Sequence, residues 1–134
     1  MTGSAGTDVR SSARALKALF YVAGTVATVA GLDTVVRGAR SVPRQRPGNP
    51  SVESELRFYA AFYAAYGLAL LGVAPRADRD TSAVRALSGA LFVAGLARAG
   101  GWVTAGRPHP FQRFLLGIEL VAPPLIVAWQ ARLA

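Results

Sequence analysis

The sequence predicts an all-α, polytopic membrane protein: a bundle of four transmembrane helices with both termini on the same side. Hydrophobic residues make up 52% of the 134 residues and charged residues only 16%, against roughly 25% charged in an average soluble domain. Four apolar runs have about the 17 to 25 residues that cross a hydrocarbon core. Three stretches, 60–73, 86–97 and 120–129, carry no charge on any side. They therefore lack the polar face that a helix of a soluble bundle needs.

The N-terminal third of the chain is expected to contain a tail and one span. Residues 1–16 are small and polar at their start and basic further on, which predicts a disordered tail. The four-helix domain then covers 17–134, and its first span covers 17–36 with Asp33 as the only internal charge. A cleaved signal peptide is the alternative, but the apolar run is long and 28–30 makes a poor cleavage site. A retained span is therefore favoured.

The other three spans follow from the remaining apolar runs, and the second has a clear start signal. They are expected at 57–73, 83–105 and 111–130. The stretch NPSVESEL at 49–56 precedes the second span. Asn49 or Ser51 can cap a helix there, and Pro50 suits the first helical turn. A helix satisfies its own backbone hydrogen bonds in lipid, which favours four helical spans.

Two opposite charges lie inside the third and fourth spans. Arg98 is seven residues before the end of its span, and Glu119 is eight residues after the start of the next. The linker 106–110 is short, so the two helices should be antiparallel neighbours. Both charges then lie at a depth of roughly 11 to 12 Å. A lone charge at mid-bilayer costs about 2.5 to 3.5 kcal/mol, so we expect an ion pair, with Gln112 on the same face of the fourth helix.

Three roles are open for this pair. It can lock the register of two helices, form a binding site for a ligand or partner, or belong to an ion or proton pathway. Pro123 and Pro124 follow Glu119 closely, and because proline lacks a backbone donor they predict a kink in the fourth helix.

Aromatic residues recur at helical spacing on the second span. The stripe consists of Tyr59, Phe62, Tyr63 and Tyr66. It fits the core of the bundle or a surface facing lipid, and it could also line a pocket for an amphiphile. The polar end of such a pocket would be a charge cluster near one end of the bundle, made of Asp33, Glu55, Arg57, Arg98 and Glu119, with the polar Gln112 beside it.

Three segments resemble a bacterial family of small four-helix membrane proteins that is catalogued as a domain of unknown function. They are SELRFYAAFYAAYGLAL at 54–70, the helix carrying Arg98, and ELVAPP at 119–124. The resemblance covers about 18–130 and implies the same architecture, but it implies no activity. It also implies that the characteristic positions are Glu55, Arg57, Arg98, Glu119 and Pro123. The N-terminal tail and an arginine-rich loop lie outside the family pattern, and 99–101 is richer in glycine than that pattern.

Enzyme chemistry finds little support in the sequence. The chain has no cysteine, and its one histidine, His109, lies between two prolines, where a turn residue is expected. No residues have metal-ligand spacing, and neither a nucleophile motif nor a phosphate-binding loop is present. We therefore expect no enzyme activity, no cofactor and no metal.

The net charge of +8 is concentrated in part in the loop 37–49. Its basic residues are Arg37, Arg40, Arg44 and Arg46. The loop has no interleaved aromatic residues, so nucleic-acid binding is not expected. It is either a solvated connector or a contact for anionic lipid headgroups or an acidic partner, since each basic residue near an anionic surface contributes about 1 kcal/mol.

The expected function is that of a non-enzymatic accessory or stabilising subunit of a larger bacterial envelope complex, for example in transport of lipid or hydrophobic solutes. Stripes of small residues at four-residue spacing would let a larger membrane protein or a second copy approach closely. They are Ala23, Ala27 and Gly31 on the first span and Ala61, Ala65 and Ala69 on the second. The alternatives are a stand-alone transporter, channel or amphiphile-binding protein that uses Arg98 and Glu119, and a membrane enzyme acting on lipid.

The expected location is the bacterial plasma membrane. Basic residues divide evenly between the two ends of the spans, seven at each, so the charge rule gives no bias. The basic N-terminal tail then favours cytoplasmic termini.

Overall fold

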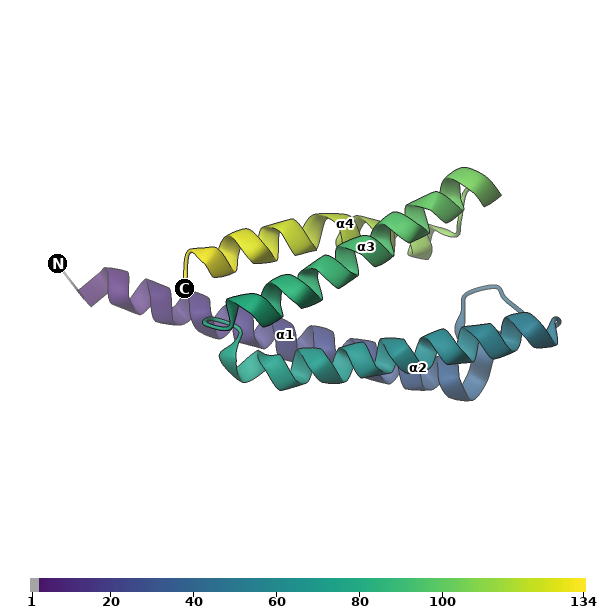
Figure 1. Cartoon of the computed structure of the whole chain (residues 1–134), viewed down its shortest axis with the longest axis horizontal. Helices are drawn as coiled ribbons and strands as arrows, with labels where there is room; N and C mark the ends of the chain where they lie inside the picture. The colour runs from purple at the N-terminus through teal and green to yellow at the C-terminus, as the bar shows by residue number, and fades with distance from the viewer. Residues whose placement is uncertain (1–2) are drawn as a thin grey trace. The chain divides into compact units, whose positions relative to one another are not determined.

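The computed structural model describes residues 3–134, and this part of the chain is helical with no strand (Figure 1). The helices are α1 (Gly3–Arg37), α2 (Pro50–Val73), α3 (Thr81–Ala105) and α4 (Pro110–Ala131), with short 3-10 turns η1 (Gly38–Ser41) and η2 (Ala74–Arg76). Each of these four helices, α1 to α4, is long and apolar enough to cross a membrane. The predicted fold class, an all-α multi-pass membrane protein with four membrane-length helices, is confirmed.

The chain forms two compact units. One is Ala18–Pro75, which contains most of α1 together with α2, and the other joins the N-terminal segment up to Lys17 to Arg76–Ala134, which contains α3 and α4. Each predicted span lies inside one of the four helices, and the fourth begins and ends one residue within α4. The helices are longer than the spans mainly at the N-terminal ends of α1 and α2.

The N-terminal segment is helical and not disordered, so that prediction is wrong for residues 3–16; Met1 and Thr2 lie outside the described residues. The segment has few apolar residues of its own, and contacts within its unit hold it. Ser12 Oγ accepts a hydrogen bond of 2.7 Å from Trp129 Nε1. Lys17 lies 3.5 Å from Asp78, and Leu16 is fully buried.

The unit Ala18–Pro75 is held by close contact between small residues of α1 and α2. A Cβ atom on Gly31 would lie 2.6 Å from the backbone nitrogen of Ala64, a distance that real Cβ atoms do not reach. Gly67 of α2 approaches the backbone of Thr28 in the same way. Because no side chain separates the backbones at these positions, the two helices pack closely along their length.

The start of α2 follows the sequence signal. The side chain of Asn49 accepts hydrogen bonds from the backbone nitrogens of Ser51 and Val52, and Pro50 is the first helical residue. The cap satisfies two of the donors that a helix leaves free at its N-terminus. Asn49 is therefore the capping residue, and α2 begins seven residues before the predicted span.

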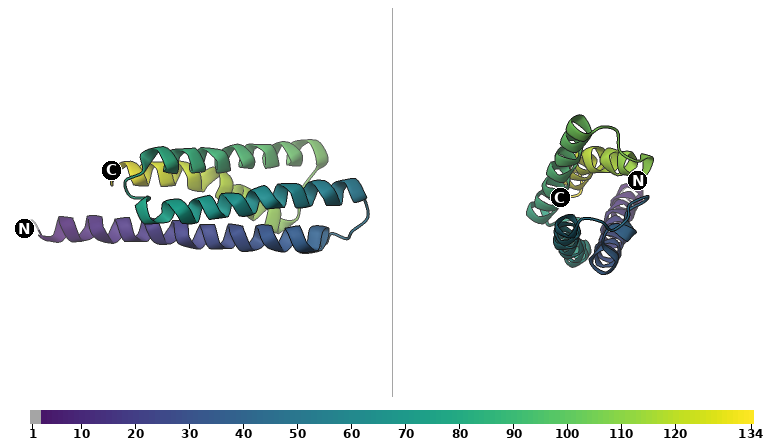
Figure 2. Two further views of the ribbon diagram at one scale, coloured as in Figure 1. Left: turned by 60° about the horizontal axis from the view of Figure 1, so that its bottom comes forward. Right: turned by 90° about the vertical axis from the view of Figure 1, so that its right-hand side faces the viewer.

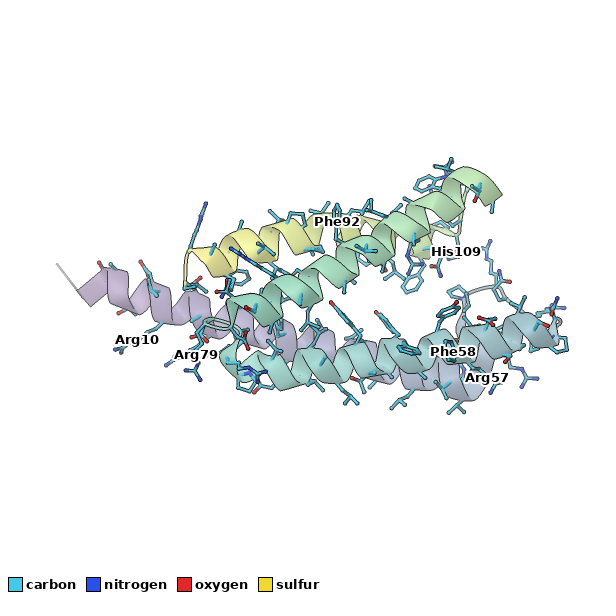
Figure 3. The ribbon with its side chains drawn as sticks, viewed as in Figure 1. Arg10, Arg57, Phe58, Arg79, Phe92 and His109 are labelled. Carbon is cyan, nitrogen blue, oxygen red and sulfur yellow. The ribbon has the colours of Figure 1, made fainter. Side chains whose placement is uncertain are left out.

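Helices α3 and α4 form an antiparallel pair in the other unit, as the short linker predicts (Figure 2). Asp80 caps α3 by accepting from the backbone nitrogen of Ala83 at 3.1 Å. His109 caps α4, because its Nδ1 accepts from the backbone nitrogen of Phe111 at 3.1 Å. The histidine lies in the turn before α4 (Figure 3), where it acts as a helix cap.

The fourth helix contains both prolines and changes direction along its length (Figure 2). Pro123 and Pro124 carry no N–H, so the backbone carbonyls of Glu119 and Leu120 lose their usual i+4 donors. The predicted kink is therefore present, with its physical cause one turn after Glu119.

Candidate functional site

Arg98 and Glu119 form a two-point ion pair between α3 and α4. Arg98 Nε donates to Glu119 Oε2 at 2.8 Å, and Arg98 Nη2 donates to Glu119 Oε1 at 2.9 Å. Arg98 Nη1 also donates to the amide oxygen of Gln112. The parallel N–H···O geometry is the strong form of such a contact. The structure thus brings together the three residues that depth and spacing predict to meet.

The two charges differ in how far they are covered. The side chain of Glu119 is 10% exposed, and that of Arg98 is 34% exposed. A carboxylate that is nearly buried needs a partner for its negative charge, and Arg98 supplies both hydrogen bonds. The side chain of Arg98 therefore stays partly exposed while all three of its guanidinium nitrogens donate hydrogen bonds.

Two local features of the sequence allow the pair to form. Gly95 lies one turn before Arg98, and a Cβ atom there would lie 2.9 Å from the Cβ of Glu119. A larger residue would push α4 away at the level of the pair. On the other helix, Pro123 is buried, and it leaves the carbonyl of Glu119 without its helical donor. The pair therefore lies where Gly95 lets α3 and α4 approach closely, one turn before the proline pair of α4.

The remaining charged residues of the predicted cluster lie in the unit Ala18–Pro75. Asp33 binds Arg37 at 3.4 Å on α1 itself. Arg57 Nη1 donates to the backbone carbonyls of Val35 and Val36 at 3.0 and 3.1 Å. These carbonyls belong to the last turn of α1, where a helix lacks internal donors. Arg57 therefore caps the C-terminal end of α1.

Glu53 also binds at the C-terminal end of α1, a role that the sequence analysis does not predict. Its carboxylate accepts from the backbone nitrogen of Ala39 at 3.2 and 3.3 Å and lies 3.8 Å from Arg57. Gly38, with φ of 59°, leaves room for that carboxylate. The four-residue spacing of Glu53 and Arg57 is the signal that would have revealed it. Glu55, which the family resemblance implies as a characteristic position, is exposed.

The aromatic stripe of α2 lies mostly on its surface. Tyr59 and Phe62 are 62% and 64% exposed, Tyr63 is 43% exposed and Tyr66 is partly buried. Phe58 joins them, with its ring centre 5.5 Å from that of Tyr59 and 5.1 Å from that of Phe62. Figure 3 labels Phe58 beside Arg57 on α2. Of the predicted alternatives, the exposed surface fits best.

The basic loop between α1 and α2 keeps three of its four arginines exposed without an ion pair among the described residues. They are Arg40, Arg44 and Arg46. Arg37 is engaged by Asp33 and donates to the carbonyl of Arg40 at 2.8 Å. Within residues 3–134, no three histidine, aspartate or glutamate side chains lie close enough together to hold a metal ion.

Four apolar helices of membrane length with a buried Arg–Glu pair define the class: a small multi-pass membrane protein. The chain matches the family DUF4345, a domain of unknown function, over residues 15–130, and it belongs to that family. The resemblance to a family catalogued as a domain of unknown function is thereby confirmed. No curated protein and no solved structure matches the chain.

Proposed function

We propose that this protein is a non-enzymatic membrane subunit that binds a larger membrane protein through the outer face of α2. The observation that carries the proposal is the division of small residues between the two faces of that helix. Ala60, Ala64 and Gly67 are buried, and the last two contact α1. A second row, Ala61, Ala65 and Ala69, is exposed.

This division distinguishes the two stripes that the sequence predicts. On α1, Ala27 is 3% exposed and Gly31 packs against Ala64, so that stripe is used inside its own unit. The stripe of α2 stays open between large apolar side chains, which include Phe62 at 64% and Leu68 at 59% exposure. Small residues let helix backbones approach closely, which drives association where lipid supplies no hydrophobic force. A helix of another protein fits such a surface.

The geometry of the ion pair supports a structural role for Arg98 and Glu119. Both oxygens of Glu119 accept from Arg98, so the guanidinium group compensates the charge of the carboxylate and occupies two of its roughly four acceptor sites. A pair of this kind fixes the register of α3 and α4.

The membrane and orientation belong to the same proposal. Four crossings place both termini on one side, and the basic residues Arg10, Arg14 and Lys17 of the N-terminal segment favour the cytoplasm. We place the protein in the bacterial plasma membrane, as part of an envelope complex for lipid or hydrophobic-solute transport.

The test is affinity purification of the full chain in mild detergent, followed by mass spectrometry. A larger membrane protein should co-purify in a fixed ratio with the wild type. Ala65→Leu fills the exposed stripe and should release it, whereas Ala90→Leu, at an exposed alanine of α3, should retain it. A protein that consistently purifies alone, or a partner retained by Ala65→Leu, contradicts the proposal.

A second candidate is supported by the exposed part of Arg98. A guanidinium group has five N–H donors, and three are engaged by Glu119 and Gln112. The other two can bind a carbonyl or hydroxyl group of an amphiphile, as a stand-alone binding protein or transporter would require. In proteoliposomes, loss of amphiphile uptake in a Glu119→Gln variant that keeps its fold would support this candidate. Loss of the fold itself would support the locking role.

A further inference from the structure

A groove runs between α3 and α4 and is open along one side. Its volume is about 490 Å³, and its lining includes Arg85, Gly89 and Phe92 from α3 and Pro123 and Pro124 from α4. Phe92 is labelled on α3 in Figure 3. All lining residues belong to the same compact unit.

Two features of the sequence shape the groove. Gly89 has no side chain, and a Cβ atom there would meet nothing within 4 Å. The proline pair forms part of the opposite wall, at the point where α4 bends. Space therefore remains between two helices that otherwise pack closely, as at Gly95, where a Cβ atom would meet Glu119 at 2.9 Å.

Arg85 is the one charged residue of this lining. It lies four residues into α3, about 6 Å from the start of the helix by helix rise, which is near the polar boundary of a membrane. Its side chain is exposed, and none of the ion pairs formed within residues 3–134 includes it. Arginine side chains at such depths extend toward the headgroup region. The groove thus has apolar walls and an unpaired cation at its outer end.

We propose that this groove binds one molecule of an anionic phospholipid, with an acyl chain between α3 and α4 and the phosphate at Arg85. From Arg85 to Phe92 the groove extends along about 10 Å of helix, enough for the upper part of an acyl chain. The acyl chain of any phospholipid can pack against the apolar walls of the groove, so the acyl chain alone gives little selectivity between lipids. The charge of Arg85 supplies it, and the site is distinct from the α2 surface assigned to a protein partner.

Native mass spectrometry of the full chain tests the proposal with equal amounts of phosphatidylglycerol and phosphatidylcholine in mild detergent. The wild type should retain one phosphatidylglycerol with about five-fold preference, the factor expected for one basic residue at an anionic headgroup. Arg85→Gln should abolish the preference. Arg79→Gln, at an exposed arginine before α3, should keep it.

Filling the groove separates this site from other lipid contacts. Gly89→Leu should remove the bound lipid. Gly117→Leu is the matched control, because a Cβ atom on Gly117 also meets nothing within 4 Å and this residue lines a different groove, formed by α4 alone. Thermal unfolding of each variant shows that the fold is kept, and a Gly89→Ala variant serves where the leucine variant does not fold.

Three results would overturn the proposal. The first is a wild type that holds both lipids equally, and the second is an equal loss of preference in Arg79→Gln. The third is a Gly89→Leu variant that keeps its lipid. If that variant instead releases a co-purifying membrane protein, the occupant of the groove is a helix of that protein.

Discussion

Arg98 and Glu119, 21 residues apart in the sequence, contact each other through two hydrogen bonds of 2.8 and 2.9 Å. The contact joins the C-terminal third of α3 to the middle of α4. Removal of one partner from such a pair leaves a charge without compensation, and removal of both does not. We therefore expect single and double substitutions of the pair to change the free energy of unfolding by different amounts.

Glu119→Gln should lower the free energy of unfolding by about 2 kcal/mol, less than the 3 to 5 kcal/mol of a fully buried pair because Arg98 is 34% exposed. The double variant Arg98→Met/Glu119→Leu should recover most of that loss. Thermal unfolding in detergent of the wild type, the double variant and the single variants Arg98→Met and Glu119→Leu forms a double-mutant cycle and measures the coupling. A double variant as unstable as Glu119→Gln would mean that the charges do not compensate one another.

Gly31→Ala should separate α1 from α2, since its Cβ would lie 2.6 Å from the backbone nitrogen of Ala64. Overpacking of this kind costs about 1 to 3 kcal/mol. Gly117→Ala is the control, because its Cβ meets nothing within 4 Å and alanine favours the helix by up to about 1 kcal/mol. Unfolding midpoints should therefore move in opposite directions, and equal midpoints would contradict the close approach of α1 and α2.

Glu53→Ala should destabilise the end of α1, because the backbone nitrogen of Ala39 loses its acceptor. The expected loss is about 1 to 2 kcal/mol for one unsatisfied donor. Glu55→Ala, at the exposed neighbour, should be close to neutral. Hydrogen exchange at residues 35–41 provides a local measurement, with faster exchange expected for Glu53→Ala alone. Equal exchange in the two variants would assign no capping role to Glu53.

The stability of the protein should fall in acid partly through Asp80. A hydrogen bond from Arg76 and a second from the backbone of Ala83 hold the pKa of this carboxyl below its usual value. A lowered pKa stabilises the fold above the unfolded value of about 3.9, and this contribution is lost as the pH falls through the folded pKa. Asp80→Asn keeps the helix cap but removes the charge. The gap between wild-type and variant unfolding midpoints should therefore shrink between pH 6 and about pH 3, and a constant gap would contradict this assignment.

The N-terminal segment shows a limit of prediction from local sequence. Residues 3–16 contain small and polar residues, and their composition alone indicates disorder. One contact of this helical segment, the hydrogen bond to Ser12, comes from Trp129, 117 residues away in the sequence. A local pattern carries no information about a partner at such a distance, so the error follows from the kind of contact involved.

The sequence by itself determined the features that depend on local composition and on counting along a helix. Uncharged runs of membrane length predict the helices, because lipid excludes unpaired polar groups. A short linker together with helix rise predicts that Arg98 and Glu119 share a depth. Neither inference needs knowledge of which helix faces touch.

Only the tertiary structure decided which of several equivalent residues make the contacts. It placed Glu53 and not Glu55 at the end of α1, buried the small residues Ala27 and Gly31, and left Ala65 exposed. Neighbouring positions on an apolar helix have nearly the same composition, so hydrophobicity does not rank its faces. The choice depends on steric fit between backbones, such as that of Gly31 against Ala64, and this fit exists only once the helices are packed.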